Sequence, residues 1–210
     1  MSVPLEGSHL YDVLPVADES HWDARIESDA GLVARARTGD YAAFEELVRR
    51  YRNDVYALAF HYLRQREDAW DASQEVFIRA HRALGRFRGD ASFKTWILRI
   101  TANCCKDLFK KRRVSTVPLE ELGGEVGAST ERDPSSELES RELGAAIEVA
   151  LDGLPQKHRI AFVLREFEGL SYQQMAEVMG CTLGTVMSRL HHARKKLQRA
   201  LIGMGVVETN

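Results

Sequence analysis

The sequence predicts an all-α fold: two small helical domains joined by a flexible acidic linker, with a helix-turn-helix in the second domain. Apolar residues recur at spacings of three and four over most of the 210 residues, whereas alternating strand patterns are scarce. This periodicity stops between residues 114 and 136, where Gly, Ser, Pro and Glu replace large apolar residues. Long segments of this kind are unusual inside one compact domain, so the pattern indicates two domains.

The first domain, residues 29–113, is expected to contain four helices. The clearest lies over residues 41–63, where Phe44, Leu47 and Val55 fall on one face. A short helix over 30–37 precedes it, and helices over 66–84 and from 93 to about 108 follow. Residues 85–92, "GRFRGDAS", form a turn, after which Ser92 or Asp90 can cap the next helix. Residues 1–28 are an acidic N-terminal extension.

The second domain, residues 137–204, begins with a helix around residues 143–151 that Gly153 ends. Pro155 opens a second helix, because its missing N–H has no partner to lose in the first turn. The stretch "SYQQ", residues 171–174, fits a capping box and starts a short helix that runs to Met179. Gly180 supplies a turn, and Thr182 can cap a last helix that runs towards Leu201.

A short helix, a Gly-containing turn and a longer basic helix describe a helix-turn-helix. Met175, Met179, Val186 and Leu190 fill its core, and Ala176 is small where the helices approach each other. Residues 185–200 carry five bases and no acid, although the helix front is uncharged. In such a motif the N-terminal residues of the second helix contact base edges in the major groove, and its cations contact phosphates. The pattern therefore predicts binding to duplex DNA. A plain helical hairpin with a solvated basic face is the alternative.

Charge is segregated along the chain, although the net charge is only −2. Residues 94–113 carry seven bases and one acid, whereas residues 114–143 carry eight acids and two bases. Two basic patches separated by acidic segments indicate two contacts with a polyanion. Alternatively, each basic patch is an ordinary helix surface that faces solvent.

Several classes of protein are disfavoured by composition. No apolar run approaches the roughly 18–20 residues of a membrane span. The N-terminus has neither the basic opening nor the apolar core of a secretory signal. The three cysteines, Cys104, Cys105 and Cys181, lack zinc-site spacing. We therefore expect a reduced, cytoplasmic protein without cofactor or metal. Adjacent Cys104 and Cys105 suggest a redox sensor, but their helical positions favour small core residues.

Residues 154–197, "LPQKHRIAFVLREFEGLSYQQMAEVMGCTLGTVMSRLHHARKKL", resemble the promoter-binding domain of extracytoplasmic-function (ECF, group IV) RNA polymerase sigma factors. The first domain is similar to the same family in "FEELVRRYRNDVYALAFHYL", "DASQEVFIRAHRALGRFRGDASFKTWILRITAN" and "KDLFKKRR". The resemblance covers about residues 29–202. It implies an alternative sigma factor that binds core RNA polymerase, recognises −35 and −10 promoter elements and promotes promoter melting. The implied partners are the β and β′ subunits of the polymerase, promoter DNA and an anti-sigma factor.

The resemblance also assigns roles to residues. For contact with the clamp helices of core polymerase it implies Asp71, Gln74 and Glu75. For the −10 element it implies Phe87, Arg88, Gly89, Asp90, Ser92, Asn103, Lys106, Lys110, Lys111, Arg112 and Arg113. For the −35 element it implies Ser171, Thr182, Leu183, Gly184, Thr185, Met187, Ser188, Arg189, His191, His192, Arg194 and Lys195. The acidic linker resembles the segment that threads the product channel of the polymerase in this family.

The chain departs from the common family pattern at three positions. Met187 and His192 stand where a cation is frequent, and Trp70 stands where an acid is frequent. Two other functions compete with a sigma factor. A stand-alone helix-turn-helix regulator would share the second domain but would not need the "DASQEVF" stretch. A metal-dependent nuclease would need grouped carboxylates with ligand spacing, which the sequence lacks.

Overall fold

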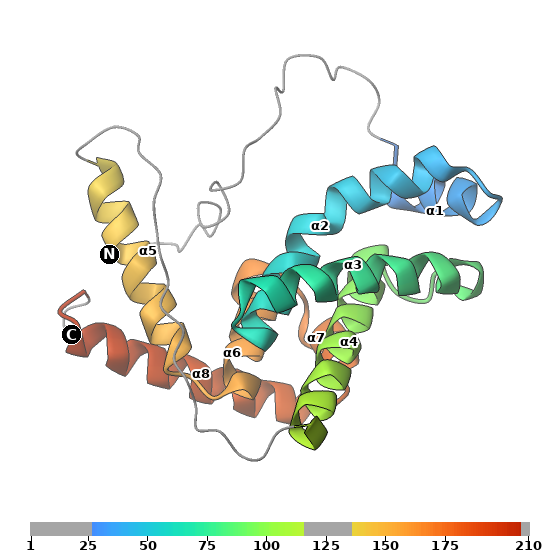
Figure 1. Cartoon of the computed structure of the whole chain (residues 1–210). Helices are drawn as coiled ribbons and strands as arrows, with labels where there is room; N and C mark the ends of the chain where they lie inside the picture. Colours follow the sequence, from blue (N-terminus) through green and yellow to red (C-terminus); the bar gives the residue numbers. More distant parts are fainter. Residues whose placement is uncertain (1–26, 116–135, 207–210) are drawn as a thin grey trace.

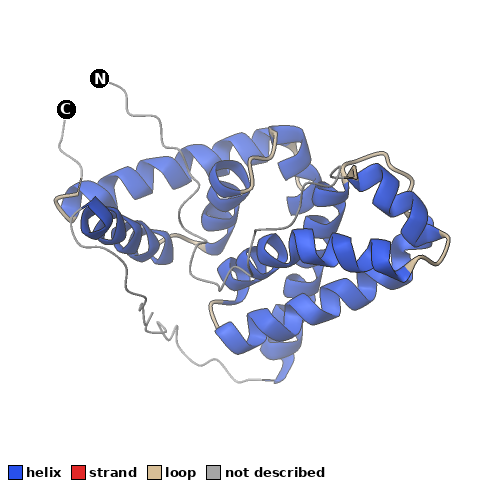
Figure 2. Ribbon diagram, turned by 90° about the horizontal axis from the view of Figure 1, so that it is seen from above, coloured by secondary structure: helices blue, strands red, loops and turns tan. Residues whose placement is uncertain are grey.

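All regular structure is helical in the computed structural model, which describes residues 27–115 and 136–206 (Figure 1, Figure 2). The predicted all-α fold is therefore confirmed for these residues. Almost all of the N-terminal extension, most of the linker and residues 207–210 lie outside the described residues. So do the side chains of Arg112 and Arg113.

The helices fall into two sets along the chain. The first set comprises α1 (Asp29–Arg37), α2 (Tyr41–Leu63), α3 (Arg66–Ala83), a 3-10 turn (Leu84–Arg86) and α4 (Phe93–Ser115). The second set comprises α5 (Ser136–Asp152), α6 (Gln156–Phe162), a π-helical turn (Val163–Phe167), α7 (Tyr172–Met179) and α8 (Leu183–Gly203). The sequence predicted each α-helix, but α4 and α5 extend further towards the linker than their apolar residues indicate.

Side-chain caps mark the start of several of these helices. Asp40 accepts a hydrogen bond from the backbone N–H of Ala43 at the start of α2. Ser92, rather than Asp90, caps α4 by accepting from the N–H of Thr95 at 3.1 Å. Such caps satisfy N–H groups that have no partner within the helix and contribute about 1 kcal/mol each. The starts of α2 and α4 are therefore encoded locally.

The two sets of helices contribute to one continuous hydrophobic core. The π-helical turn and α7 supply Leu164, Met175 and Val178, which are buried in the same cluster as Leu58 of α2 and Ile97 of α4. Figure 1 shows α6 and α7 beside α2, α3 and α4, whereas α5 and the C-terminal half of α8 extend away from them. A second, smaller core joins α5 to α8 through Leu151, Leu154, Ala193 and Leu197.

Polar contacts accompany this shared core. Arg159 of α6 donates from Nε to the carbonyl of His61 at 3.0 Å, and Gln156 donates to the carbonyl of Tyr62 at 2.9 Å. Both carbonyls belong to the last turn of α2, where helix carbonyls have no partner within the helix. The first turn of α6 therefore completes the hydrogen bonding of the C-terminus of α2. The division into two independent domains at residues 114–136 stays a prediction.

We predict that Leu164→Ala lowers the free energy of unfolding by about 2–5 kcal/mol, because it leaves a cavity at a fully buried position. Leu143→Ala is the matched control, since Leu143 of α5 is 40% exposed. Chemical denaturation of both variants measures the difference. Equal, small effects would contradict the placement of Leu164 in the core.

Candidate nucleic-acid interface

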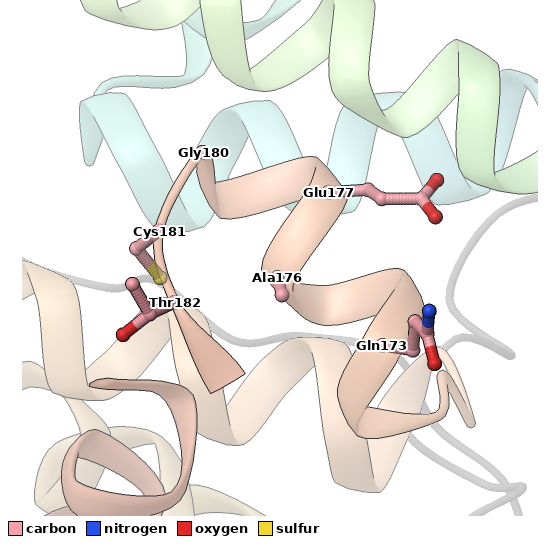
Figure 3. A pocket seen from close by; sticks show the side chains of 6 residues that line it. All are labelled: Gln173, Ala176, Glu177, Gly180, Cys181 and Thr182. Atoms are coloured by element: carbon pink, nitrogen blue, oxygen red, sulfur yellow. The ribbon is translucent and has the colours of Figure 1, made fainter. Parts of the chain in front are cut away.

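The helix-turn-helix predicted from the sequence is present in α7, residues 180–182 and α8. Ser171 and Gln174 form the capping box: the Ser171 N–H donates to Gln174 Oε1 at 2.8 Å, and the Gln174 N–H donates to Ser171 Oγ at 3.3 Å. Gly180 has φ +64°, a left-handed conformation that suits glycine. Figure 3 shows the turn with Cys181 and Thr182 after Gly180, and Ala176 on α7.

Apolar packing fixes the angle between α7 and α8. Met175 and Met179 of α7 and Val186 and Leu190 of α8 are all buried, as predicted. Thr182 caps α8 by accepting from the N–H of Thr185 at 3.3 Å. The hydroxyl groups of Thr182 and Thr185 also share a hydrogen bond of 2.9 Å, and the Ser171 hydroxyl accepts from the N–H of Gln174. All three hydroxyl groups are therefore hydrogen-bonded at the start of a helix.

The exposed face of α8 carries most of the residues expected at the −35 element. The exposed members are Leu183, Gly184, Met187, Ser188, His191, His192, Arg194 and Lys195. Arg189 differs, because it is half-buried and donates from Nη1 to the sulfur of Cys181 at 3.6 Å. Arg194 pairs with Glu166 at 2.6 Å. Lys195 and Lys196 are exposed cations, so the basic half of α8 faces solvent as the sequence predicted.

A second group of predicted residues lines one hollow, which is formed by the loop before α4, by α4 itself and by α7. Phe87, Arg88, Gly89 and Asp90 border it together, and Gly89 has φ +81° in the loop. The ring centroid of Phe87 lies 5.0 Å from that of Trp96 and 6.1 Å from that of Phe93. The loop is therefore held by aromatic packing at the start of α4, with arginines around the hollow.

The hollow is also lined by residues that the sequence did not assign to it. Arg86 and Ala91 lie within the predicted turn, Arg99 lies one turn after Trp96 on α4, and Glu177 comes from α7 of the second set. The helical spacing from Trp96 to Arg99 could have indicated Arg99, whereas nothing local indicates Glu177. Asn103 is exposed on α4 and is not among the residues that line the hollow.

The basic end of α4 divides into free and engaged cations. Lys110 and Lys111 are exposed. Lys106 is half-buried and donates from Nζ to the carbonyl of Met179 at 3.1 Å, at the C-terminus of α7. Burial lowers the pKa of Lys106. One cation expected at the −10 element is thus bonded to the helix-turn-helix.

The third predicted surface lies on α3. Asp71 and Gln74 are exposed, and Glu75 accepts from Arg79 Nε at 2.8 Å. Trp70 and Ile78, which flank them, are exposed by 60% and 46%. Two large apolar side chains beside exposed polar ones are typical of the edge of a protein interface.

Charged groups are buried where the two sets of helices meet. Lys94 of α4 pairs with Glu168 at 2.9 Å and with Asp54 of α2 at 3.3 Å. Burial, helped by Asp54 and opposed by Lys94, raises the pKa of the Glu168 carboxyl to about 7. Burial lowers the pKa of His61 to about 3, helped by Arg64 and Arg159. Both groups therefore tie the stability of this contact to pH.

Two of the three cysteines belong to the hydrophobic core. Cys104 and Cys105 are buried in the core as predicted, and burial raises the pKa of the Cys105 thiol to about 12. Within residues 27–115 and 136–206, no three His, Cys, Asp or Glu side chains are grouped so that they could hold a metal ion. None of the described helices is long and apolar enough to cross a membrane.

The fold and these surfaces define an all-helical protein with a basic helix-turn-helix, a second cationic hollow and an exposed mixed surface on α3. Sequence models of two families match the chain: "Sigma-70 region 2" over residues 47–114 and "Sigma-70, region 4" over residues 144–197. The α3 surface and the cationic hollow lie in the first match, and the helix-turn-helix lies in the second.

Similar proteins agree with these matches. The RNA polymerase sigma-H factor of Pseudomonas aeruginosa is 38% identical over 182 residues, which cover 83% of this chain and 94% of that relative. The ECF RNA polymerase sigma-E factor of Escherichia coli K12 is 38% identical over 177 residues, which cover 81% and 92%.

Two solved structures share the fold. The structure of CnrH in complex with the cytosolic domain of CnrY has a TM-score of 0.62 and 27% identity, covering 84% of this chain and 99% of that one. The sigma factor RpoE from Bartonella quintana, in complex with the anti-sigma factor NepR, has a TM-score of 0.60 and 23% identity, covering 75% and 96%.

The chain belongs to the ECF family of RNA polymerase sigma factors. It is an alternative sigma factor that acts in transcription initiation, with core RNA polymerase and promoter DNA as its partners. Members of this family are not enzymes.

We predict that Glu168→Gln changes how stability depends on pH. The pKa of Glu168 is raised in the folded chain, so the folded state binds the proton more tightly than the unfolded state. The stability due to the protonated carboxyl is complete below the unfolded pKa of about 4.5 and is lost as pH rises towards 7. The wild type should therefore lose stability relative to Glu168→Gln over this window. Denaturant titrations at several pH values measure it, with Glu45→Gln on the exposed surface of α2 as control.

Proposed function

We propose that the chain reads two promoter elements through two separate surfaces while its α3 surface binds core polymerase. Asp71, Gln74 and Glu75 contact the clamp helices of the polymerase. Phe87, Arg88, Gly89, Asp90 and Ser92, together with Asn103, bind an unpaired base and its neighbours at −10. The exposed face of α8 enters the major groove at −35. The observation that carries the proposal is the presence of all three surfaces in one chain.

The electrostatic contribution comes from the ends of α4 and α8. Lys106, Lys110, Lys111, Arg112 and Arg113 belong to the C-terminal half of α4, and Lys195 belongs to α8. Cations placed against phosphates release condensed counterions, which gives affinity without sequence preference. Specificity then depends on contacts with base edges.

Promoter melting requires no bound nucleotide in this scheme. A protein that binds the unpaired −10 strand better than the duplex shifts the equilibrium towards the open form. Stacking of an unpaired base on an aromatic side chain contributes about 1–3 kcal/mol. Phe87 and Trp96 are the aromatic residues at the hollow, although Trp96 is only 8% exposed and serves mainly as core.

We further infer a cytoplasmic location, no catalytic activity, no cofactor and regulation by an anti-sigma factor. Support for the anti-sigma partner comes from similar structures, because the RpoE structure was solved with an anti-sigma factor. We propose that residues 29–113 and 137–204 are the two domains of this family, and that linker 114–136 follows the product channel of the polymerase.

Run-off transcription tests the function. Core polymerase from the organism that encodes the chain is mixed with the purified protein and fragments of its own genome. We predict discrete transcripts that require the protein and disappear with the double variant Asp71→Ala/Glu75→Ala. Glu45→Ala, an exposed carboxylate of α2, should leave them unchanged. Specific retention of duplex DNA without any transcript would indicate a stand-alone regulator instead.

The salt dependence of binding tests the phosphate contacts. We predict that Lys195→Ala reduces the slope of log affinity against log salt for the −35 duplex by about 0.9, the value for one lost phosphate contact. Arg37→Ala, at the exposed end of α1, should leave the slope unchanged. A slope unaffected by Lys195→Ala would place this cation away from the DNA backbone.

A further inference from the structure

The front of α8 presents apolar side chains to solvent. Leu183 is 44% exposed and Met187 is 46% exposed, and they lie one turn apart on the same side of the helix. Gly184 and Ser188 beside them are also exposed and small, so the surface near these two residues is open. Val186 and Leu190, on the adjoining side of the helix, are buried in the core, so Leu183 and Met187 lie at the border between the buried and the exposed face.

The same region lacks an available arginine. Arg189 donates to the sulfur of Cys181 and lies half-buried behind the helix front. No other Lys or Arg occurs between residues 183 and 193. The two-pronged contact of an arginine with guanine, which is the commonest specific contact in the major groove, is therefore not offered by the first turns of α8.

An apolar helix front on a basic helix matches one feature of duplex DNA. The C5-methyl group of thymine is the apolar group that base pairs present in the major groove. We propose that Leu183 and Met187 specify the −35 element by contacting thymine methyl groups. This inference rests on the proposed function, because it requires α8 to enter the major groove.

Charge favours DNA over a protein partner for this face. The exposed cations Lys195, Lys196 and Arg199 continue along α8, and residues 185–200 contain no acid. A helix with exposed apolar residues in its first turns and exposed cations further along suits a groove bordered by phosphates.

The test compares thymine with deoxyuridine, which lacks only the methyl group. Holoenzyme formed from the full chain and core polymerase selects duplexes from a random library, and the selected −35 element is synthesised with either base. We expect each contacted methyl group to contribute about fourfold in affinity, the factor for burying one carbon of this kind. Leu183→Ala and Met187→Ala should each abolish the preference at one position, whereas Gln198→Ala, exposed on α8, should retain it.

Three results would overturn the inference while the function stands. They are a selected element without thymine, equal binding of thymine and deoxyuridine duplexes, or variants that weaken assembly with core polymerase without changing the thymine preference. The last would make this face a protein-binding surface. Failure to select any duplex would contradict the proposed function and this inference together.

A different observation carries a second inference, about the contact between α7 and α4. The carbonyl of Met179 holds Lys106, and exposed Glu177 borders the same hollow as Arg86, Arg88 and Arg99. Figure 3 shows Glu177 projecting from α7 away from Cys181 and Thr182 at the turn. An acidic side chain thus lies among the arginines of the hollow that we assign to the −10 strand.

We infer that α7 restrains the −10 hollow in the free chain, because it engages one cation and places a carboxylate beside three others. Attachment of the −10 strand then requires α7 to leave this position. The inference rests on the proposed role of the hollow. In holoenzyme on an open promoter, by contrast, Glu177 should no longer affect the affinity for DNA.

Binding of a labelled single strand from a mapped −10 element tests the restraint. Glu177→Gln should raise the affinity of the free chain several-fold, with Glu45→Gln unchanged, and should leave the affinity of holoenzyme for the open promoter unchanged. No gain in the free chain would overturn the inference. An equal gain in holoenzyme would also overturn it, because the effect would then be a general one of charge.

Discussion

The structure depends on the burial of the π-helical turn and α7 against α2 and α4. Leu164, Met175 and Val178 complete a core that α1 to α4 begin, so helices from both sides of the linker are stabilised by the same apolar surface. Lys94 and Glu168 lie at the edge of this contact, and Lys106 bonds to the end of α7. The apolar burial supplies most of the free energy, and the polar contacts fix which surfaces face each other.

This shared core determines what each functional surface can reach. It leaves α3 and the outer face of α8 open to solvent, which suits contacts with core polymerase and duplex DNA. It also places Glu177 at the hollow that we assign to the −10 element. A carboxylate at this position repels the phosphates of a single DNA strand. If the hollow binds the −10 strand while α8 binds the −35 element, as we propose, α7 must leave the hollow. In this proposal the free chain and the DNA-bound chain use the same residues in different contacts.

Local signals made the helices and the helix-turn-helix predictable from the sequence. Ser171, Thr182 and Gly180 act through hydrogen bonds and backbone angles within a few residues, and the structure confirms each of them. The shared core was not predictable, because an apolar stripe shows that a helix face is buried but not what covers it. Val178 is an example: it is buried on the side of α7 that serves the common core, and only Met175 and Met179 were expected to be buried. The inward position of Arg189 likewise depends on Cys181 across the turn.

The most direct test of this account is the distance between α4 and α7 in the free chain and in holoenzyme on a promoter. Fluorescent dyes attached at the exposed positions Asp107, next to Lys106 on α4, and Gln173 of α7 report it by energy transfer in single molecules. The account predicts one short-distance population for the free chain and a clearly longer distance once core polymerase and promoter DNA are bound. The same distance in both states would contradict it, because the two readers would then never separate.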